Sequence, residues 1–341
     1  MSTALYPSLA GLELRIDGCR TERRSVDVST GFTRVTTTIV LEGDGARGEG
    51  EDVAYDAEDH EEYPEALDLA GRWTLDGISR RLDGLDLFPK SPVWETSTDY
   101  RRWAFESAAL DLALRQAGIS LGEALGQAYR PVRFVVSTRL DPRRWLALDP
   151  ALEFKLDPEP DWTRQRMREL AATDRVRVLD YKGYYSGTSV DLDPDPELYR
   201  QVAEAFPDAI LEDPAWNDRT ARALAGHEGR LSWDAPVHSV EDLDALPVRP
   251  RFLNVKPSRF GTLRRLLDCL DACRDRGIVC YGGGQFELGS GRGQIQALAS
   301  LFYPDAPNDV APGGYNAPEP VAGLPASPLM PPPSPKGFGF S

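Results

Sequence analysis

The sequence of 341 residues is poor in histidine and cysteine, and each scarcity narrows what the chain can be. None of the three histidines lies in an HExxH motif, so a histidine-rich metal site or a histidine-dependent triad has little support. The four cysteines show no CxxC spacing, which favours buried thiols in a reducing cytoplasm over zinc ligands. If the chain binds a metal ion, carboxylates are therefore the expected ligands.

Long apolar runs and an excess of basic charge are also missing. No stretch approaches the roughly 18 apolar residues that cross a bilayer, and the N-terminus does not resemble a signal peptide. The net charge of −15 argues against nucleic acid, whose phosphates require a basic face, and against an anionic membrane surface. We therefore expect a cytoplasmic protein that acts on a small molecule and binds neither nucleic acid nor membrane.

The first 130 residues combine strand-like and helical segments. Alternating or β-branched runs predict strands over 12–16 and 34–41. Helical periodicity and its end signals predict helices over 61–85, 100–117 and 120–128. Strands followed by helices indicate an α+β domain over residues 1–130.

After Pro131, short apolar runs alternate with helical stretches. The predicted strands are 133–137, 152–156, 176–180, 209–212, 230–234, 252–256 and 277–281. The predicted helices between them are 161–172, 195–206, 217–226, 239–245, 262–276 and 292–302. This alternation is typical of parallel strands joined by crossover helices, and its length favours a TIM-like barrel over residues 131–323. A barrel end left exposed would also favour a homo-oligomer, although no residue pattern points to one.

The last segment, residues 324–341, is rich in proline. Proline lacks the backbone N–H that a helix interior or a central strand requires. We expect an extended tail that either packs on the body of the protein or is disordered.

Charged residues end most of the predicted barrel strands. Successive strands end at Lys155, Asp180, Glu212, Asp234 and Lys256. Because the C-terminal ends of parallel strands meet at one mouth of a barrel, we expect these side chains to converge. Carboxylates without a counterion would repel one another, and a hard cation such as Mg²⁺ removes that repulsion. We predict a magnesium site at Asp180, Glu212 and Asp234, although any one acidic strand end is more often a solvated loop charge.

Lysine is the rare cation of this chain, with five lysines beside 34 arginines. Three of the five, Lys155, Lys182 and Lys256, lie at or just after predicted strand ends. Arginine does not lose its proton in proteins, whereas a desolvated lysine can act as a base. The placement predicts these three lysines as catalytic acid or base groups. The alternative is that arginine richness is a coding bias and the placement is chance.

The same segments, taken in order, resemble the enolase superfamily, in particular its muconate-lactonizing-enzyme and o-succinylbenzoate-synthase branch. VLDYKG (178–183), ILEDP (210–214), LSWD (231–234) and LNVKPSRFG (253–261) are similar to its third to sixth barrel strands. GGGQFELGSGRG (282–293) looks like the seventh strand with its glycine-rich turn, and ESAALDLA (106–113) looks like the helix before the barrel. The resemblance implies a (β/α)7β barrel with an N-terminal α+β capping domain that the C-terminal tail completes.

The second predicted strand departs from the pattern of that branch. The branch carries Lys-x-Lys there, with the second lysine as catalytic acid or base, whereas this chain has Lys155-Leu156-Asp157. Lys182, in turn, occupies a position that usually holds asparagine. Because the second and third strands are neighbours, we expect Lys182 to bring an ammonium group to the face that lacks the second lysine.

The resemblance implies a Mg²⁺-dependent enzyme that removes the α-proton of a carboxylate substrate through an enediolate. Loss of a β-leaving group would make it a lyase or isomerase, that is, a dehydratase or cycloisomerase of the o-succinylbenzoate-synthase kind. Reprotonation would make it a racemase or epimerase. The rival class is a non-catalytic barrel that binds a carboxylate or a metal, and a third alternative is a phosphate-ester enzyme that uses the glycine-rich turn.

Candidate substrate contacts come from the glycine-rich turn and from two polar N-terminal loops. The turn lacks the Lys-Ser/Thr of a P-loop, so we expect it to close against a substrate anion and not to bind a nucleotide. Loops 17–24 and 51–60 are expected to cover the mouth of a capped barrel and to select the substrate. The predicted substrate-binding residues are Glu287, Gly283, Tyr55 and Arg20.

Overall fold

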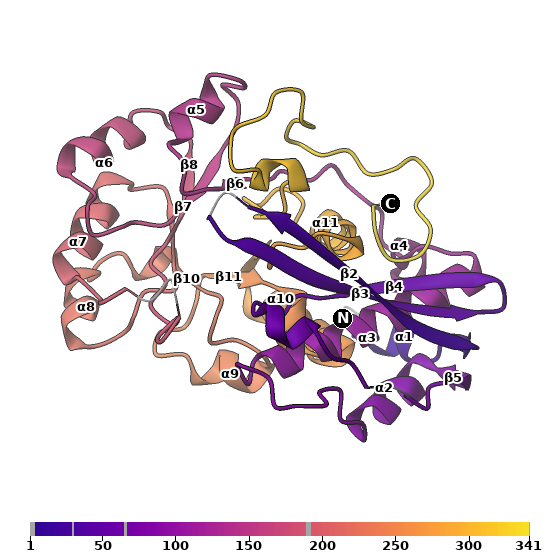
Figure 1. The fold of residues 1–341 in the computed structure, drawn as a ribbon. Coiled ribbons are helices and arrows are strands. Elements are labelled where there is room, and N and C mark those ends of the chain that lie inside the picture. Colours follow the sequence, from indigo (N-terminus) through magenta and orange to yellow (C-terminus); the bar gives the residue numbers. More distant parts are fainter. Residues whose placement is uncertain (1–3, 29–30, 65–66, 189–191, 341) are drawn as a thin grey trace.

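A computed structural model of the protein describes residues 4–28, 31–64, 67–188 and 192–340 (Figure 1). It combines a curled parallel sheet with a smaller antiparallel sheet, and the early part of the chain forms the antiparallel one. The fold class expected from the sequence, a TIM-like barrel with an N-terminal α+β cap, is confirmed. Within the described ranges, the helices are too short or too polar to span a membrane.

The barrel sheet contains seven parallel strands in chain order. They are β6 (Val136–Ser137), β7 (Phe154–Leu156), β8 (Val176–Asp180), β9 (Ile210–Glu212), β10 (Leu231–Trp233), β11 (Phe252–Val255) and β12 (Val279–Gly282). The helices that connect or follow them are α5 (Pro142–Leu146), α6 (Arg164–Ala171), α7 (Pro196–Ala205), α8 (Asp218–Ala223), α9 (Val240–Ala245), α10 (Leu263–Arg276) and α11 (Ser290–Phe302). Each predicted strand and helix of this region has its counterpart, and most boundaries agree within about two residues.

Residues 308 and 309 join the two edge strands and so close the sheet. The Val135 N–H donates to the Asn308 carbonyl, and the Asp309 N–H donates to the Gly282 carbonyl, each over 2.8 Å. The Asn308 side chain is fully buried; it accepts the Gly282 N–H over 2.7 Å and donates to the Arg133 carbonyl over 2.8 Å. A short irregular segment therefore takes the eighth position of the barrel, which the sequence pattern did not resolve as a strand.

The cap is a three-stranded sheet packed on a long helix. Its strands are β2 (Gly18–Asp27), β3 (Thr33–Gly43) and β4 (Ala46–Asp52), and the helix is α3 (Ser97–Ala117). Helix and sheet lie so close that a Cβ at Gly48 or Gly50 would collide with the carbonyl oxygens of Ala108 or Ala104. Glycine at these two positions is what allows β4 to lie against α3.

The remaining elements are short. They are α1 (Pro7–Ala10), β1 (Glu13–Ile16), β5 (Gly71–Thr74), α2 (Leu75–Asp83), α4 (Leu121–Leu125) and the 3-10 turns η1 (Ala57–His60), η2 (Glu228–Arg230), η3 (Pro257–Phe260) and η4 (Gly313–Asn316).

Two expectations for the N-terminal region were wrong. The helix predicted over 61–85 begins only at Leu75, because residues 71–74 pair with β1 and the Thr74 side chain caps α2 by accepting the Gly77 N–H. Residues 18–24, expected as loop, lie in β2, whose exposed side chains leave no hydrophobic alternation to read.

The C-terminal tail packs against the body, which is one of the two arrangements expected. The backbones of Leu329 and Val132 exchange two hydrogen bonds of 2.8 and 2.9 Å. Phe338 is buried, and its ring lies edge-on to Trp103 with 6.2 Å between the ring centres. The tail therefore links the start of the barrel to the cap helix α3.

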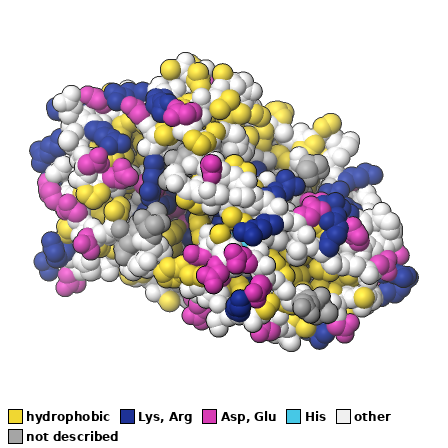
Figure 2. Space-filling view, in the orientation of Figure 1, with side chains coloured by type: hydrophobic (Ala, Val, Ile, Leu, Met, Phe, Trp, Pro, Cys, Tyr) yellow, Lys and Arg dark blue, Asp and Glu magenta, His cyan; other side chains and the backbone are white. Residues whose placement is uncertain are grey.

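Acidic and basic side chains are interleaved over helices α5 to α8 on the outside of the barrel (Figure 2). Arg200 on α7, for example, pairs with Glu197 and Glu204, each over 2.6 Å. On this side the charged side chains form solvated ion pairs, which contribute little to stability.

Removal of the Asn308 side chain tests how the barrel is closed. Asn308→Ala leaves the buried Gly282 N–H and Arg133 carbonyl without their partner, so we expect the free energy of unfolding to fall by about 3 kcal/mol. Gln165→Ala, a change of an exposed side chain on α6, is the control and should change it by less than about 0.5 kcal/mol. Urea unfolding measures both. Equal stability of the two variants would show that Asn308 does not close the barrel.

Candidate active site

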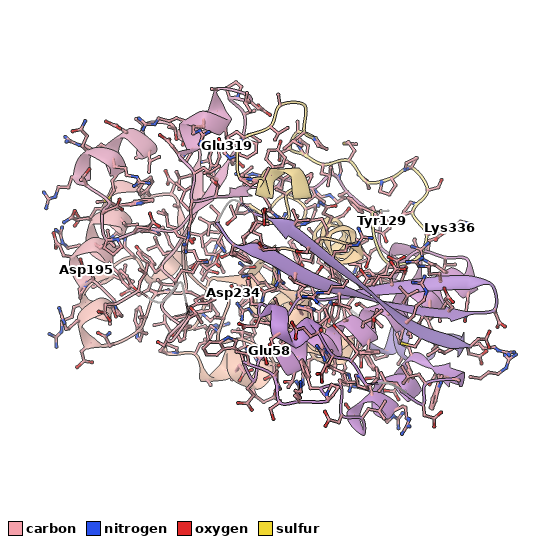
Figure 3. All side chains as sticks on the ribbon, viewed as in Figure 1. Glu58, Tyr129, Asp195, Asp234, Glu319 and Lys336 are labelled. Carbon is pink, nitrogen blue, oxygen red and sulfur yellow. The ribbon has the colours of Figure 1, made fainter. Side chains whose placement is uncertain are left out.

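The C-terminal ends of the barrel strands bring the predicted charged residues together in the interior. Lys155 is the second-to-last residue of β7, Asp180 ends β8 and Glu212 ends β9. Asp234 and Lys256 follow β10 and β11 directly. All five side chains are buried. Figure 3 places Asp234 between the barrel strands and the cap strands β2 and β3, so the cluster lies where the cap covers the barrel mouth.

Lys155 ties two of the carboxylates together. Its Nζ lies 2.5 Å from Glu212 Oε1 and 3.1 Å from Asp180 Oδ2. Burial lowers the pKa of Lys155, but Glu212 and Asp180 together raise that pKa well above its ordinary value. In this arrangement Lys155 is a protonated counterion of the carboxylates.

Lys182 reaches back to the end of its own strand. Its backbone is left-handed, with a φ of 54°, a conformation that a non-glycine residue adopts at a cost. The Lys182 ammonium group contacts Asp180 Oδ2 and lies 3.6 Å from Asp157 Oδ1. Asp157 stands where the resembling family has its second lysine, so the structure brings Lys182 beside that position.

Lys256 and Arg259 hold Asp234 between them. Lys256 Nζ lies 2.7 Å from Asp234 Oδ2, and Arg259 Nε donates to Asp234 Oδ1 over 2.8 Å. Arg259 also donates to the hydroxyls of Tyr185 (2.9 Å) and Tyr100 (3.2 Å). Burial raises the pKa of Asp234, but Arg259 and Lys256 outweigh it and bring that pKa well below its ordinary value. Sequence reasoning missed Arg259, although it lies three residues after the predicted catalytic lysine.

Three buried carboxylates could hold a metal ion. Asp180, Glu212 and Asp213 each offer an oxygen, and these oxygens all lie within 4.8 Å of one another. Burial, with Asp180 and Asp234 adding to it and Lys155 opposing it, raises the pKa of Glu212 to about 7. Burial and the neighbouring carboxylates also raise the pKa of Asp213 well above its ordinary value. Crowded oxygen donors whose charges repel one another fit a hard divalent cation.

Asp213 was not among the predicted ligands, and Asp234 lies beside the trio. The two oxygens of Asp213 accept the backbone N–H groups of Asp234 and Ala235 over 2.7 and 2.9 Å. The carboxylate oxygens of Asp234 contact the side chains of Tyr185, Lys256 and Arg259. Among the described residues, the oxygen set that lies together is that of Asp180, Glu212 and Asp213, and Asp234 would join Asp180 and Glu212 only if its side chain shifted. The second acid of the ILEDP segment was the sequence signal for Asp213.

Of the four predicted substrate contacts, the structure brings two close to this cluster. The Tyr55 hydroxyl donates to Gln285 Oε1 over 2.8 Å. Burial raises the pKa of Tyr55, and the positive charge of Lys256 acts in the opposite direction. A Cβ on Gly283 would lie 2.9 Å from Lys256 Cγ. Gly283 thus lies directly against the lysine.

The other two predicted contacts lie elsewhere. Glu287 is buried between the turn and the cap, where it accepts the Gln285 N–H over 2.7 Å. Arg20 lies on β2 opposite Val40 and pairs with Glu22 and Glu42 at the surface, so the structure does not bring it to the mouth. The expectation for Arg20 assumed that residues 17–24 form a loop over the barrel mouth. Residues 18–24 lie instead in strand β2, which places Arg20 at the surface.

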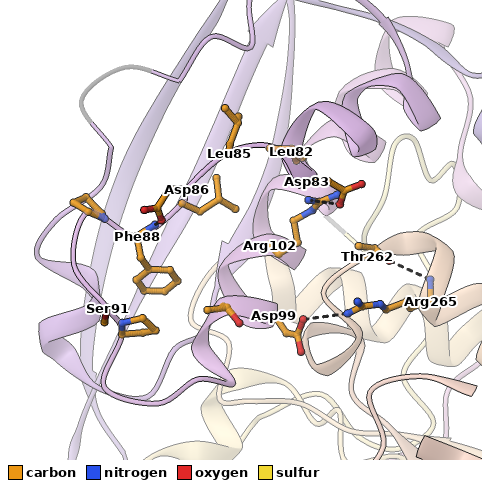
Figure 4. A pocket seen from close by; sticks show the side chains of 14 residues that line it. Leu82, Asp83, Leu85, Asp86, Phe88, Ser91, Asp99, Arg102, Thr262 and Arg265 are labelled. Atoms are coloured by element: carbon orange, nitrogen blue, oxygen red, sulfur yellow. Dashed lines mark hydrogen bonds and ion pairs between the residues drawn. The ribbon is translucent and has the colours of Figure 1, made fainter. Parts of the chain in front are cut away.

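A hollow of about 530 Å³ lies on the outside, between the α2–α3 connection and α10 (Figure 4). Four of its five charged residues are paired with one another: Arg102 lies 3.0 Å from Asp83, and Arg265 lies 3.4 Å from Asp99. The fifth, Asp86, accepts the Phe88 N–H over 3.0 Å. It includes none of the strand-end residues. We therefore place the candidate active site at the barrel mouth and not in this hollow.

Comparisons with known proteins identify the family of the chain and structures that share its fold. Two family models match the chain: the N-terminal domain of a domain of unknown function (DUF8230) over residues 7–124, and its C-terminal domain over residues 128–317. Among curated proteins, o-succinylbenzoate synthase of Geobacillus stearothermophilus is 27% identical over 224 residues, which cover 61% of this chain and 58% of that protein. The o-succinylbenzoate synthase of Bacillus subtilis is 26% identical over 218 residues, covering 60% of this chain and 57% of that protein. The chain thus matches less than two thirds of the length of these relatives.

Solved structures of the enolase superfamily share the fold over nearly the whole chain. The dipeptide epimerase from Methylococcus capsulatus, complexed with Mg and the dipeptide L-Arg-D-Lys, has a TM-score of 0.69 at 18% identity, covering 96% of this chain and 99% of its own. The muconate lactonizing enzyme from Pseudomonas putida has a TM-score of 0.66 at 18% identity, covering 96% of each chain. At such identities the likeness concerns the fold alone. The resemblance expected from the sequence is confirmed at the level of fold and of partial sequence similarity.

Loss of a strand-end carboxylate tests the metal site. Asp180→Asn removes one charged oxygen donor, so we expect the affinity for Mg²⁺, measured by calorimetric titration, to fall about tenfold or more. The same titration of Asp213→Asn and Asp234→Asn identifies the third ligand, because only the ligand's variant should match Asp180→Asn. Asp99→Asn, a change outside the barrel mouth, is the control. Unchanged affinity in Asp180→Asn would contradict the site.

Proposed function

We propose that this chain, which belongs to the DUF8230 family and has the enolase-superfamily fold, is an enzyme that removes the α-proton of a carboxylate substrate in a Mg²⁺-dependent reaction through an enediolate. The observation that carries the proposal is the pair of lysines on either side of the buried carboxylates. Lys182 follows β8 and Lys256 follows β11, with β9 and β10 between them. Two amines therefore approach the carboxylate cluster from opposite sides.

Asp180, Glu212 and Asp234 are the proposed metal ligands. Asp213 is better suited to hold the β10 end in place, because both of its oxygens accept backbone N–H groups. When bound, Mg²⁺ supplies the positive charge that balances these carboxylates and that a substrate carboxylate needs as its negative charge grows. Lys155 stays the ammonium counterion of Glu212 and Asp180.

Lys256 is the proposed base. Burial lowers the pKa of its ammonium group, whereas Asp234 opposes burial and raises it overall. Once another partner neutralises Asp234, burial and the positive charges of Arg259 and Lys155 lower the pKa of Lys256 toward the range in which an amine accepts a proton. Lys256 Nζ then takes the α-proton, and the electron pair of the C–H bond moves into the substrate carboxylate.

The fate of the enediolate depends on the substrate. If the β-carbon carries a leaving group, the electron pair expels it, and the reaction is a β-elimination of the o-succinylbenzoate-synthase kind. If it carries none, Lys182 on the opposite side can return a proton, and the product is the epimer. The position of Lys182 beside Asp157 favours this second candidate, since epimerisation requires a base on one face of the α-carbon and a proton donor on the other.

Lys256→Ala removes the proposed base. We expect deuterium incorporation at the α-carbon of accepted acids in heavy water, followed by NMR over a panel of carboxylic acids, to slow about a thousandfold. Lys90→Ala is the matched control, because Lys90 is an exposed lysine that pairs with the exposed Glu62. Incorporation at the wild-type rate in Lys256→Ala would refute the assigned mechanism.

Lys182→Asn tests the amine on the opposite side. The substitution installs the residue usual for the family and removes the second amine, so incorporation should fall about a hundredfold. The double variant Asp157→Lys with Lys182→Asn returns an amine to the second strand and should recover part of the loss. Full activity of Lys182→Asn alone would mean that Lys182 takes no part in proton transfer.

A further inference from the structure

The glycine-rich turn after β12 forms an anion site at the start of α11, and a carboxylate of the chain itself fills it. Glu51, the second-to-last residue of β4 in the cap, accepts the N–H groups of Leu288 (2.6 Å), Gly289 (2.9 Å) and Gly291 (2.9 Å). Only 2% of Glu51 is exposed. The substrate anion expected here from the sequence would have to compete with Glu51, so that expectation does not fit the structure.

The turn is built to admit this carboxylate. A Cβ on Gly291 would lie 2.8 Å from Glu51 Oε2, and one on Gly289 would lie 3.0 Å from Thr38 Oγ1. A side chain at Gly291 would displace the Glu51 carboxylate, and one at Gly289 would press on the Thr38 side chain of β3. The start of a helix stabilises a negative charge, and here the stabilised charge belongs to another layer of the fold. Helix α11 lies next to the cap strands in Figure 1.

The same turn forms a wall of the candidate active site. Gly283, near its beginning, lies against Lys256, and Gln285 accepts the Tyr55 hydroxyl. The fully buried Arg34 donates to the Gln285 carbonyl over 2.9 Å and to the Val53 carbonyl over 2.6 Å. The cap thus holds the turn at two points, through Arg34 near Gly283 and through Glu51 at the start of α11.

We propose that Glu51 is a positioning residue that couples cap closure to the placement of Lys256. The Glu51 carboxylate fixes residues 288–291, which are the last part of the glycine-rich turn. That turn holds Gly283 against Lys256. The Lys256 amine is thereby kept at the carboxylate cluster. The Glu51 carboxylate bonds to the backbone of the turn, so it acts through the turn and not on the reacting atoms. The effect on catalysis rests on the proposed function, whereas the effect on the turn does not.

Chemical rescue tests the proposal. Glu51→Ala leaves three N–H groups around a space that formate can enter. We expect faster hydrogen–deuterium exchange of the peptide covering 286–292, read by mass spectrometry, and an α-proton exchange kcat lower by about tenfold or more. Millimolar formate should restore both. Asp111→Ala is the matched control: Asp111 is also a buried cap carboxylate that accepts backbone N–H groups, from Glu49 and Phe338, but it does not contact the turn.

The outcomes separate the positioning role from the proposed function. Formate-dependent recovery in Glu51→Ala but not in Asp111→Ala supports the positioning role. Unchanged protection of 286–292, or a loss that formate does not reverse, overturns it. If the wild-type protein exchanges no α-proton of any acid while the formate response persists, the proposed function fails and the placement of the turn stands. If Glu51→Ala does not fold, Glu51→Gln, which keeps the shape and loses the charge, should show a smaller loss of protection.

Discussion

Charge compensation among buried side chains at the barrel mouth is the constraint on which the rest of the structure depends. An isolated carboxylate in a protein interior costs several kcal/mol, roughly, unless it is paired. Here Lys155, Lys182, Lys256 and Arg259 supply that pairing for Asp180, Glu212 and Asp234. Removal of one partner leaves the buried charge of the other unpaired, so the charges of the cluster depend on one another. A cation that replaced the ammonium groups would free the lysines for proton transfer without leaving the carboxylates unpaired.

The cap keeps this cluster away from bulk water. The buried Arg101 on α3 pairs with Asp52 at the end of β4 over 2.8 Å, and its guanidinium group lies 3.6 Å from the centre of the Phe88 ring. This pair fixes the chain just before Tyr55, whose hydroxyl donates to Gln285 on the glycine-rich turn. Glu51, the neighbour of Asp52, binds the turn that faces Lys256. The end of β4 therefore contacts the cap helix through Asp52 and the glycine-rich turn of the candidate active site through Glu51.

Much of the barrel could be predicted because its signals are local. Apolar runs that end at a charged residue predict the strand ends at Asp180, Glu212 and Lys256. Because the strands are parallel, those charged residues then lie at one mouth of the barrel. The roles of Asp213, Arg259 and Glu51 could not be read in this way, because each depends on which side chain or backbone group of a distant segment it meets. Arg20 was misplaced for a related reason: β2 is exposed on both faces, so its sequence resembles a loop.

The dependence of α-proton exchange on Mg²⁺ in the unmodified protein is the most direct test of this account. We predict that, over a panel of carboxylic acids in heavy water, at least one acid gains deuterium at its α-carbon when Mg²⁺ is present. Chelation should abolish the incorporation, and renewed Mg²⁺ should restore it. Incorporation that continues without the metal, or none with any acid although Mg²⁺ binds, would contradict the assignment of the barrel mouth as a metal-dependent site of proton abstraction.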